Sequence, residues 1–336
     1  MSDSLFMQRC LTLAQKGLGY TYPNPMVGCV VVHEGKIIAE GWHKKAGKDH
    51  AEREAILSVK NQHILSNSTL YVNLEPCDHQ GKTPPCSDLI VQMKIPRVVI
   101  GCLDQNQKVF GKGLKKLQAA GCAVKTGVLE TQCIELNRRF FSFHQKKRPY
   151  VILKWAESAD GFIAPKNTNT KYWLTDVLSK QRVHQWRSQE QAIMIGLHTA
   201  LIDNPKLNTR LWAGNNPTPV VIDPNQKLSH SDNHLVKEKN TIIIVNKKLE
   251  ATDAHTQIDA ADILKRLYQE ELQSVIIEGG TKTLQHFIDA NLWDEARIFI
   301  TKKKWHDGVK GPQINKNLIA SSTTLKEDTL VTLYKD

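Results

Sequence analysis

The sequence predicts an α/β protein of two domains, each with a mostly parallel or mixed sheet and helices on its faces. Three observations lead to this prediction. The chain has 336 residues, which is long for a single hydrophobic core. Patterns typical of helices and of strands alternate along both halves of the chain. All seven cysteines lie within the first 133 residues, so the two halves also differ in composition.

The first half alternates helix and strand patterns as far as residue 143. A helix is expected over about residues 4–18, and GCVVVHEGKIIAEGWH is typical of two strands that turn at Glu34-Gly35. The elements expected after this hairpin are the helix AEREAILSVK, the strand STLYVNLE, the helix CSDLIVQMK, the strand RVVIGCLD, the helix GKGLKKLQAAG ended by Gly121, the strand AVKTGV and a helix over about 130–143.

A polar, basic stretch, HQKKRPY, separates the two halves. We place the boundary within residues 144–149, so that the domains span 1–145 and 149–336. The elements expected beyond it are the strand YVILKWA, a helix around 176–189, the strands AIMIG, TPVVID and TIIIVN, a helix over about 259–271, the strand SVIIEGG, a helix over about 283–291 and the strand ARIFIT. No G-x-G-x-x-G follows the first of these strands, so the ordinary Rossmann fingerprint is absent.

The net charge of +11 suits anionic partners such as phosphate esters, nucleotides or nucleic acids. The lysines are scattered, however, and no aromatic-interleaved RNA-binding motif accompanies them, which favours a solvated basic surface. No apolar run approaches the roughly 18 residues of a membrane helix, and the N-terminus does not resemble a secretory signal. An odd number of cysteines without such a signal favours reduced thiols. We therefore expect a cytoplasmic protein without a membrane or nucleic-acid partner.

A histidine, a glutamate and two cysteines predict a metal site in the first half. His50 and Glu52 stand at the start of a predicted helix, and Cys77 and Cys86 follow in Glu-Pro-Cys and Pro-Pro-Cys. One histidine and two cysteines leave the fourth position of a tetrahedral zinc to water, as in catalytic sites. Such water loses a proton near neutral pH, and Glu52 is the candidate proton shuttle. Zinc deaminases carry H-x-E and P-C-x-x-C, whereas eight residues separate these cysteines. A disulfide is the competing interpretation, which a reducing compartment disfavours.

The first half resembles the deaminase domain of the bifunctional riboflavin-biosynthesis deaminase/reductase family, part of the cytidine-deaminase-like superfamily. The matching stretches are YTYPNPMVGCVVV, GWHKKAGKDHAEREA and LYVNLEPCDHQGKTPPC, and HxGKTPPC is the family's own form of the cysteine motif. The resemblance implies that Asn24 and His43 help to hold a pyrimidine. It also implies that His79 and Lys82 contact the substrate, with Lys82 near its phosphate. Taken alone, Asn24 suits a turn and Lys82 a solvated surface.

Three stretches of the second half, AESADGFIA, GLHTALIDNPKLNTR and VIIEGGTKTL, suggest binding sites. A strand that runs into Gly279-Gly280 at a helix N-terminus suits a phosphate, although a tight turn explains the glycines equally well. Together with YWLTD and HQWRSQ, these stretches resemble the reductase domain of the same family over about residues 150–300. That domain resembles dihydrofolate reductase in fold and uses NADPH. The two resemblances together imply three α/β/α layers in each domain of this chain.

The resemblance implies two sets of contacts in this second domain. Those to the cofactor would come from Glu157, Trp173, Thr199, Asp203, Gly279 and Gly280. Those to the substrate would come from Lys171, Arg187, Leu207, Arg210 and Glu278. Guanidinium groups bind phosphate bidentately, which suits Arg187 and Arg210, but surface salt bridges explain both arginines without the resemblance. Ala159 and His198 stand where the family usually has leucine and glycine.

The resemblance implies two consecutive reactions in riboflavin biosynthesis on one small phosphorylated pyrimidine. Zinc-dependent hydrolytic deamination of a diaminopyrimidine ribosylamino 5′-phosphate precedes NADPH-dependent reduction of its ribosyl group to ribityl. We expect one catalytic zinc, NADPH and a homo-oligomer. One alternative is a tRNA or nucleoside deaminase with an appended inactive or unrelated domain, which the charge of +11 would suit. Another is a binding module with inactive domains, against which the intact set of His50, Glu52, Cys77 and Cys86 argues.

Overall fold

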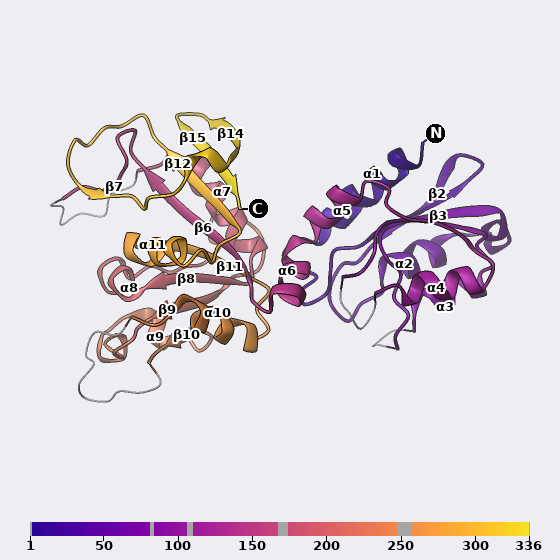
Figure 1. Cartoon of the computed structure of the whole chain (residues 1–336), viewed down its shortest axis with the longest axis horizontal. Helices are drawn as coiled ribbons and strands as arrows, with labels where there is room; N and C mark the ends of the chain where they lie inside the picture. Colours follow the sequence, from indigo (N-terminus) through magenta and orange to yellow (C-terminus); the bar gives the residue numbers. More distant parts are fainter. Residues whose placement is uncertain (1, 81–83, 106–109, 167–173, 247–256, 336) are drawn as a thin grey trace. The chain divides into compact units, whose positions relative to one another are not determined.

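The computed structural model describes residues 2–80, 84–105, 110–166, 174–246 and 257–335. The chain folds as two compact units, Met1–Lys147 and Arg148–Asp336 (Figure 1). Each unit has its own main sheet with helices on both faces. The expected α/β fold class is thereby confirmed. Among the helices in the described ranges, none combines the length and the apolar character needed to cross a membrane.

The first unit is built on a five-stranded mixed sheet in the order β2-β1-β3-β4-β5. Strand β1 pairs antiparallel with β2 and β3, whereas β3, β4 and β5 are parallel. The strands are β1 (Gly28–His33), β2 (Lys36–Trp42), β3 (Ser68–Leu74), β4 (Arg97–Cys102) and β5 (Ala123–Lys125). The predicted hairpin and its Glu34-Gly35 turn are therefore present, and both turn residues have positive φ.

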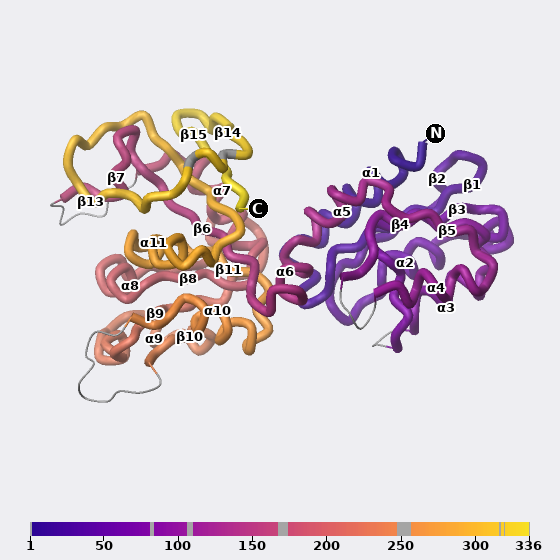
Figure 2. The backbone as a smooth tube through the Cα atoms, viewed as in Figure 1, coloured from indigo at the N-terminus to yellow at the C-terminus, as the bar shows by residue number. Residues whose placement is uncertain are grey.

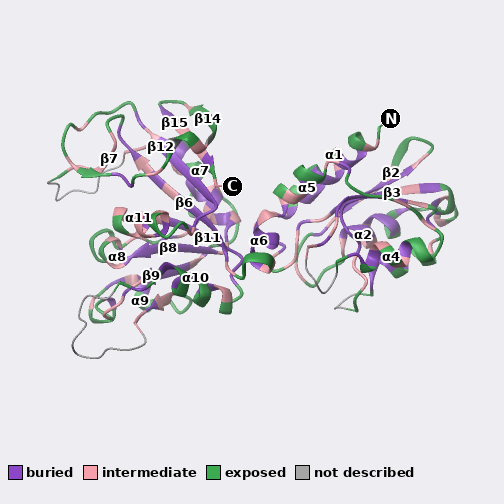
Figure 3. Cartoon of the chain, in the orientation of Figure 1, coloured by how far each residue is buried: buried purple, intermediate pink, exposed green. Residues whose placement is uncertain are grey.

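Helices cover both faces of this sheet. One face carries α1 (Asp3–Ala14), α5 (Glu130–Leu136) and α6 (Arg138–Lys146), and the other carries α2 (Ala51–Ser58), α3 (Cys86–Gln92) and α4 (Lys112–Ala119). Successive side chains of a strand point to opposite faces, so Val30 packs in the first layer and Val31 in the second. Figure 3 shows the resulting pattern: the inner strands β1, β3 and β4 are buried between helices whose outer surfaces are exposed.

The single helix expected over 130–143 is two helices, α5 and α6, separated at Asn137. The side chain of Asn137 is buried and binds the backbone of Met26: its Oδ1 accepts from the Met26 N–H, and its Nδ2 donates to the Met26 carbonyl. This long-range contact has no local sequence signal, which explains why the break was not predicted.

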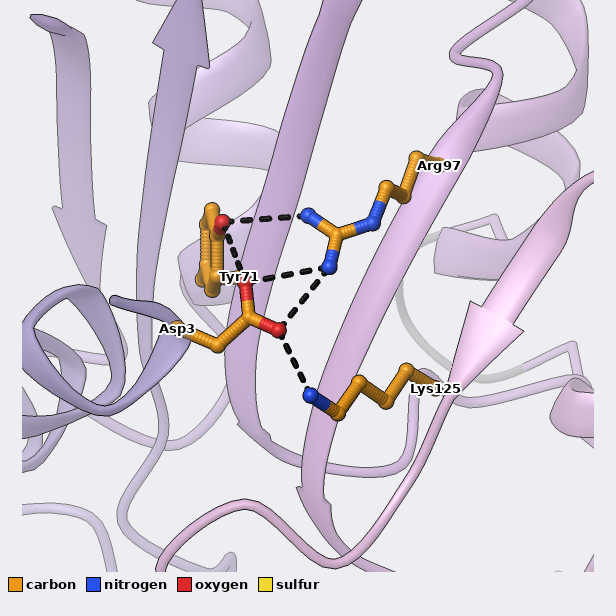
Figure 4. A network of polar contacts seen from close by, with 4 residues as sticks. All are labelled: Asp3, Tyr71, Arg97 and Lys125. Atoms are coloured by element: carbon orange, nitrogen blue, oxygen red, sulfur yellow. Dashed lines mark hydrogen bonds and ion pairs between the residues drawn. The ribbon is translucent and has the colours of Figure 1, made fainter. Parts of the chain in front are cut away.

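A polar network fastens α1 to three neighbouring strands (Figure 4). The Asp3 carboxylate accepts hydrogen bonds from Arg97 Nη2 at 2.9 Å, Lys125 Nζ at 2.8 Å and the Tyr71 hydroxyl at 2.9 Å. These partners belong to β4, β5 and β3. Partial burial raises the pKa of Asp3, but the hydrogen bonds from Lys125, Arg97 and Tyr71 outweigh it and lower the pKa to about 2. Asp3 is thus a carboxylate throughout the neutral range.

Replacing Asp3 by asparagine is expected to destabilise the protein by about 1–2 kcal/mol at pH 7, after discounting for the exposed ends of Arg97 and Lys125. The folded-state pKa of Asp3 lies below its unfolded value. The contribution of the Asp3 carboxylate to the free energy of unfolding is therefore fully present above about pH 4. It is lost as the pH falls towards the folded value of about 2. Calorimetry from pH 7 to pH 3 should show that the difference in unfolding free energy between wild type and Asp3→Asn becomes smaller. A difference that does not change with pH would contradict the lowered pKa of Asp3. Asp49→Asn, which removes an exposed pair with Arg53, is the control.

The second unit is built on an eight-stranded sheet in the order β10-β9-β8-β11-β6-β12-β15-β14. The first six strands in this order are parallel, and β15 and β14 continue the sheet antiparallel. The strands are β6 (Tyr150–Glu157), β8 (Ala192–Gly196), β9 (Thr218–Ile222), β10 (Ile242–Ile244), β11 (Ser274–Gly279), β12 (Glu295–Ile300), β14 (Ile319–Leu325) and β15 (Asp328–Tyr334).

Helices again pack on both faces. One face carries α7 (Val177–Gln189), α8 (Leu197–Asp203) and α9 (His234–Lys237), and the other carries α10 (Ala260–Gln269) and α11 (Thr281–Asp289). Strand β13 (Val309–Lys310) pairs with β7 (Phe162–Ala164) in a separate two-stranded sheet (Figure 2). The sequence did not predict α8, α9, β7, β13, β14 or β15. Most of these elements are short. Of the two long strands, IASSTTL carries mostly small or polar residues, and DTLVTLY mixes polar and apolar residues without strict alternation.

Candidate active sites

His50, Cys77 and Cys86 converge although they are distant in sequence. His50 immediately precedes α2, Cys77 follows the end of β3, and Cys86 is the first residue of α3. The Nδ1 atom of His50 lies 3.4 Å from each sulfur, and all three ligand atoms lie within 4.8 Å of one another. A tetrahedral zinc with bonds of about 2.3 Å to sulfur and about 2.0 Å to nitrogen separates such atoms by about 3.5 Å. The three residues therefore fit zinc and leave its fourth position open.

The electrostatics of this cluster also suit a cation. The hydrogen bond between the two thiols has the largest effect on both cysteines: it lowers the pKa of Cys77 to about 4 and raises the pKa of Cys86 well above its usual value. At Cys77, burial opposes the lowering and His50 adds to it. Zinc binds the thiolate form of cysteine. In the part of the chain that the structure describes, no other group of three histidine, cysteine or acidic side chains is arranged to hold a metal ion.

Glu52 lies in the first turn of α2, and its side chain points into the same buried region. The residue is only 3% exposed. Burial raises the pKa of Glu52 to about 7, and the nearby Cys77 adds to this effect. The carboxyl group is also within hydrogen-bonding reach of the Cys86 thiol. A carboxyl group with a pKa near neutrality is suited both to accept and to donate a proton.

Asn24 and His43 form a pair beside the metal ligands. The amide nitrogen of Asn24 lies 3.0 Å from His43 Nε2, and His43 Nδ1 lies 3.0 Å from the Asp49 carbonyl. If Nδ1 carries the proton and donates to Asp49, then Nε2 accepts from Asn24. Burial lowers the pKa of His43, which keeps the ring neutral at pH 7. The His43 ring meets the His50 ring edge-on, with 5.4 Å between their centroids.

The loop that carries Asn24 is held by two buried asparagines that sequence reasoning missed. Asn73 Oδ1 accepts from the Gly28 N–H at 2.7 Å, and Asn137 binds both backbone groups of Met26. The polar Asn73 within the apolar strand STLYVNLE was an available signal. Of the two other predicted contacts, His79 is exposed two residues after Cys77, and Lys82 lies outside the described residues.

Among the described residues of the second unit, two of the cavities share part of their lining. Their volumes are about 860 Å³ and about 450 Å³. Thr199, Asp203 and Glu278 line both cavities. The larger cavity opens at the carboxyl ends of the parallel strands, where ligands bind in open α/β sheets. The predicted cofactor residues Gly279 and Gly280 line the larger cavity, and the predicted substrate residues Arg187, Leu207 and Arg210 line the smaller one.

A buried ionic group stands where the two cavities meet. Glu278 accepts from Arg187 Nε at 2.9 Å and from Arg187 Nη2 at 2.8 Å, and Lys154 Nζ lies 3.6 Å from Glu278. Burial raises the pKa of Glu278, but Arg187 and Lys154 outweigh it and bring the pKa to about 2. Sequence reasoning missed Lys154, although a lysine inside the apolar strand YVILKWA signals a buried charge.

The remaining predicted residues of this unit either lie outside the described residues or line neither cavity. Lys171 and Trp173 lie outside the described residues. Glu157 is buried at the end of β6 and accepts from the Trp155 indole N–H at 2.8 Å, and it is not among the residues that line either cavity. In the Asp-Gly turn, the Asp160 carboxylate accepts from the backbone N–H groups of Trp305 and His306. This aspartate therefore fastens a neighbouring loop.

Leu207 lines the smaller cavity in a backbone conformation unusual for leucine. Its φ is 51°, in the left-handed region, while its side chain is buried in the core on the α7 face. Residues other than glycine pay of order 1–2 kcal/mol for this region. The buried side chain holds the backbone in this conformation at the cavity wall.

Both halves of the chain are similar to known proteins. Residues 1–102 match the cytidine and deoxycytidylate deaminase zinc-binding region, and residues 149–303 match the RibD C-terminal domain. The riboflavin biosynthesis protein RibD of Actinobacillus pleuropneumoniae is 40% identical over 90% of this chain and 84% of its own length. That of Aquifex aeolicus is 36% identical over 99% of this chain and 96% of its own length.

Solved structures show the same relationship over the whole chain. A diaminohydroxyphosphoribosylaminopyrimidine deaminase/5-amino-6-(5-phosphoribosylamino)uracil reductase from Thermotoga maritima is 37% identical, with a TM-score of 0.87 and 99% of both chains covered. A RibD structure from Acinetobacter baumannii is 29% identical, with a TM-score of 0.86 over 99% of this chain and 98% of its own. The chain therefore belongs to the RibD family of riboflavin biosynthesis, bifunctional enzymes that join a zinc-binding deaminase domain to a reductase domain.

Proposed function

We propose that this chain deaminates a diaminopyrimidine ribosylamino 5′-phosphate in its first unit and reduces the ribosyl group of the product to ribityl in its second. The observation that carries the proposal is the convergence of His50, Cys77 and Cys86 beside the buried Glu52. The relative from Thermotoga maritima, which is named for these two activities, supports the choice of substrate. Residues 1–145 would carry the deaminase and residues 149–336 the reductase.

In the first unit, the chain would position the pyrimidine and move a proton. Zinc held by His50, Cys77 and Cys86 supplies a Lewis acid and an activated water. The Glu52 carboxylate would accept the proton of the attacking water and donate it to the departing amine, because it is buried beside the candidate metal ligands and within reach of the Cys86 thiol. Asn24 and the neutral His43 would hold the pyrimidine, because their polar atoms lie beside the metal ligands. His79 and Lys82 would contact the ribose phosphate.

In the second unit, the larger cavity would hold the cofactor and the smaller one the substrate. NADPH supplies the hydride. Gly279 and Gly280 precede the N-terminus of α11, where backbone N–H groups and the absence of side chains suit the phosphates of the cofactor. Thr199 and Asp203 line both cavities, so they would orient the two molecules towards each other. Trp173 would complete the cofactor side, and Lys171 the substrate side. Glu157, which lines neither cavity, would contribute to the cofactor side by holding the indole of Trp155, which lines the larger one.

The charges of the smaller cavity favour a phosphate ester. Arg187 already binds Glu278 with two nitrogens and donates from Nη1 to the Asn208 carbonyl at 3.1 Å. Arg210 is exposed and donates to the side chain of Asn208. Arg210 would therefore clamp the substrate phosphate, and Arg187 would mainly orient Glu278. Leu207 would present its backbone to the substrate.

We further propose that the enzyme works in the cytoplasm as a homo-oligomer without nucleic-acid or membrane partners. The net charge of +11 supports a phosphorylated substrate.

The two proposed activities are tested by incubating zinc-loaded protein with the diaminopyrimidine ribosylamino phosphate, with and without NADPH. Ammonia should be released whether or not NADPH is present. When NADPH is present, its absorbance should fall after ammonia has been released. Absence of ammonia would refute the first activity, and ammonia without NADPH oxidation would refute the second.

A further inference from the structure

The segment Glu75–Asp78, which carries the ligand Cys77, rests against helix α4. This helix spans Lys112–Ala119, beyond the residues that match the deaminase zinc-binding region, which end at residue 102. The zinc ligands themselves lie on other elements, at the start of α2, after β3 and at the start of α3. Helix α4 therefore belongs to neither the ligand set nor the matched region, yet it contacts the metal-binding loop at several points.

Glu75 makes the most buried of these contacts. The residue is 4% exposed, and one carboxylate oxygen accepts from the Asp104 N–H at 3.2 Å and from the Gly111 N–H at 3.0 Å. The other oxygen accepts from the Leu114 N–H at 3.2 Å. The N–H groups in the first turn of a helix have no partners within that helix. The Glu75 carboxylate supplies this missing acceptor and bonds directly to the start of α4.

The next residue of the segment touches the helix backbone. A side chain at Gly113 would place its first carbon 2.0 Å from the Pro76 carbonyl oxygen, so only glycine permits this approach. Cys77 is thus flanked on its N-terminal side by two residues, Glu75 and Pro76, that are both in contact with α4. This leaves the loop little freedom to move its sulfur relative to the helix.

Asp78 makes an equivalent connection on the C-terminal side of Cys77. Its carboxylate accepts from Lys116 Nζ of α4 at 2.7 Å and from the Ser87 hydroxyl at 2.7 Å. Ser87 directly follows the second ligand, Cys86. Two backbone N–H groups at the start of α3 also bond to Cys77. Cys86 N donates to Cys77 Sγ at 3.4 Å, and Ser87 N donates to the Cys77 carbonyl at 3.1 Å. Asp78 thus joins both ligand segments to α4.

We propose that Glu75 and Asp78 are positioning residues that fasten both cysteine segments to α4 and so hold the sulfurs at the separation that zinc requires. The inference rests on the zinc site of the proposed function. Neither carboxylate is assigned as a zinc ligand. Residues that orient metal ligands typically change metal affinity by about 10–100-fold when they are replaced.

The test compares zinc affinity in Glu75→Gln and Asp78→Asn with that of the wild-type full-length chain, by competition with a colorimetric chelator. Each variant is expected to bind zinc about 10–100-fold more weakly. Loading with Co²⁺ adds a spectroscopic readout, because the thiolate-to-cobalt and d–d bands report ligand geometry. Both bands should shift or weaken in the two variants. Lys116→Met should reproduce the effect of Asp78→Asn, whereas Lys116→Arg should retain most of the wild-type affinity.

Glu40→Gln is the matched control. Glu40 pairs with Arg9 at 2.6 Å, and this pair involves neither cysteine segment nor α4. The zinc affinity of this variant should stay within about threefold of wild type, because the pair is partly exposed and distant from the cysteine segments. Circular dichroism and thermal unfolding of each variant serve as controls for folding, because the substitutions lie in the first unit. Unchanged zinc affinity and cobalt spectra in both Glu75→Gln and Asp78→Asn would overturn the inference, whereas a wild-type protein that takes up no zinc would overturn the proposed function itself.

Discussion

Replacing Glu52 by glutamine is expected to slow ammonia release by on the order of 10³-fold, within the range for loss of a general acid–base group. Glutamine keeps the shape of the side chain but cannot accept the proton of the attacking water at neutral pH. The ligands His50, Cys77 and Cys86 are unchanged, so the variant should still bind one zinc per chain. Ammonia release with a coupled assay and metal content by elemental analysis measure the two outcomes.

Glu54→Gln provides the matched control for this prediction. Glu54 lies on the same helix but is partly exposed, where it pairs with Lys44 at 2.6 Å. This variant should retain most of the deaminase activity. NADPH-dependent reduction of the already deaminated substrate should be unchanged in both variants, because it depends on the second unit. A Glu52→Gln protein that binds zinc and deaminates at the wild-type rate would show that another group moves the proton.

Replacing Glu278 by glutamine is expected to lower the rate of NADPH oxidation by roughly 100-fold or more, because small displacements of reacting groups have effects of this size. Glu278 is a buried carboxylate that pairs with both Arg187 and Lys154 at the meeting point of the two cavities. An amide removes the negative charge and leaves both cations uncompensated, which typically costs about 3–5 kcal/mol in stability. Steady-state kinetics and thermal unfolding together measure the effect.

Glu270→Gln makes the same chemical change at an exposed position of the second unit, where Glu270 pairs with Arg266 at 2.6 Å. Its effect on reduction should be within about twofold, because exposed pairs contribute little. Ammonia release should stay at the wild-type level in both variants and provides an internal control for the integrity of the first unit. A folded Glu278→Gln protein that reduces the substrate normally would remove this carboxylate from the proposed mechanism.

The long, strongly patterned elements and the candidate zinc ligands were accessible from the sequence. Strands such as GCVVVH and SVIIEGG are apolar on both faces because helices cover both sides of each sheet, and this makes them visible as continuous apolar runs. His50, Glu52, Cys77 and Cys86 were accessible because zinc chemistry demands particular residue types in a recognisable order. Spacing alone left the eight residues between the cysteines unexplained, and only the family resemblance accounted for them.

Short elements and polar networks depended on long-range contacts. Asn137 interrupts a predicted helix because its amide binds Met26, 111 residues earlier in the chain. Lys154 and Glu278 meet because β6 and β11 are neighbours in the sheet, although 124 positions separate them in the sequence. No local pattern specifies such pairs, since each residue in isolation is an ordinary charged or polar side chain.

The amino-acid sequence was sufficient to predict the fold class, the order of most main strands and helices, the candidate zinc ligands and the family resemblance. Only the folded chain shows that His50 Nδ1 lies 3.4 Å from each cysteine sulfur. The same holds for the two cavities that share Thr199, Asp203 and Glu278, and for the hydrogen bonds that join the cysteine segments to α4. This difference arises because hydrophobic periodicity is a local property of the chain. The distances between chemical groups, in contrast, depend on how distant segments pair and pack.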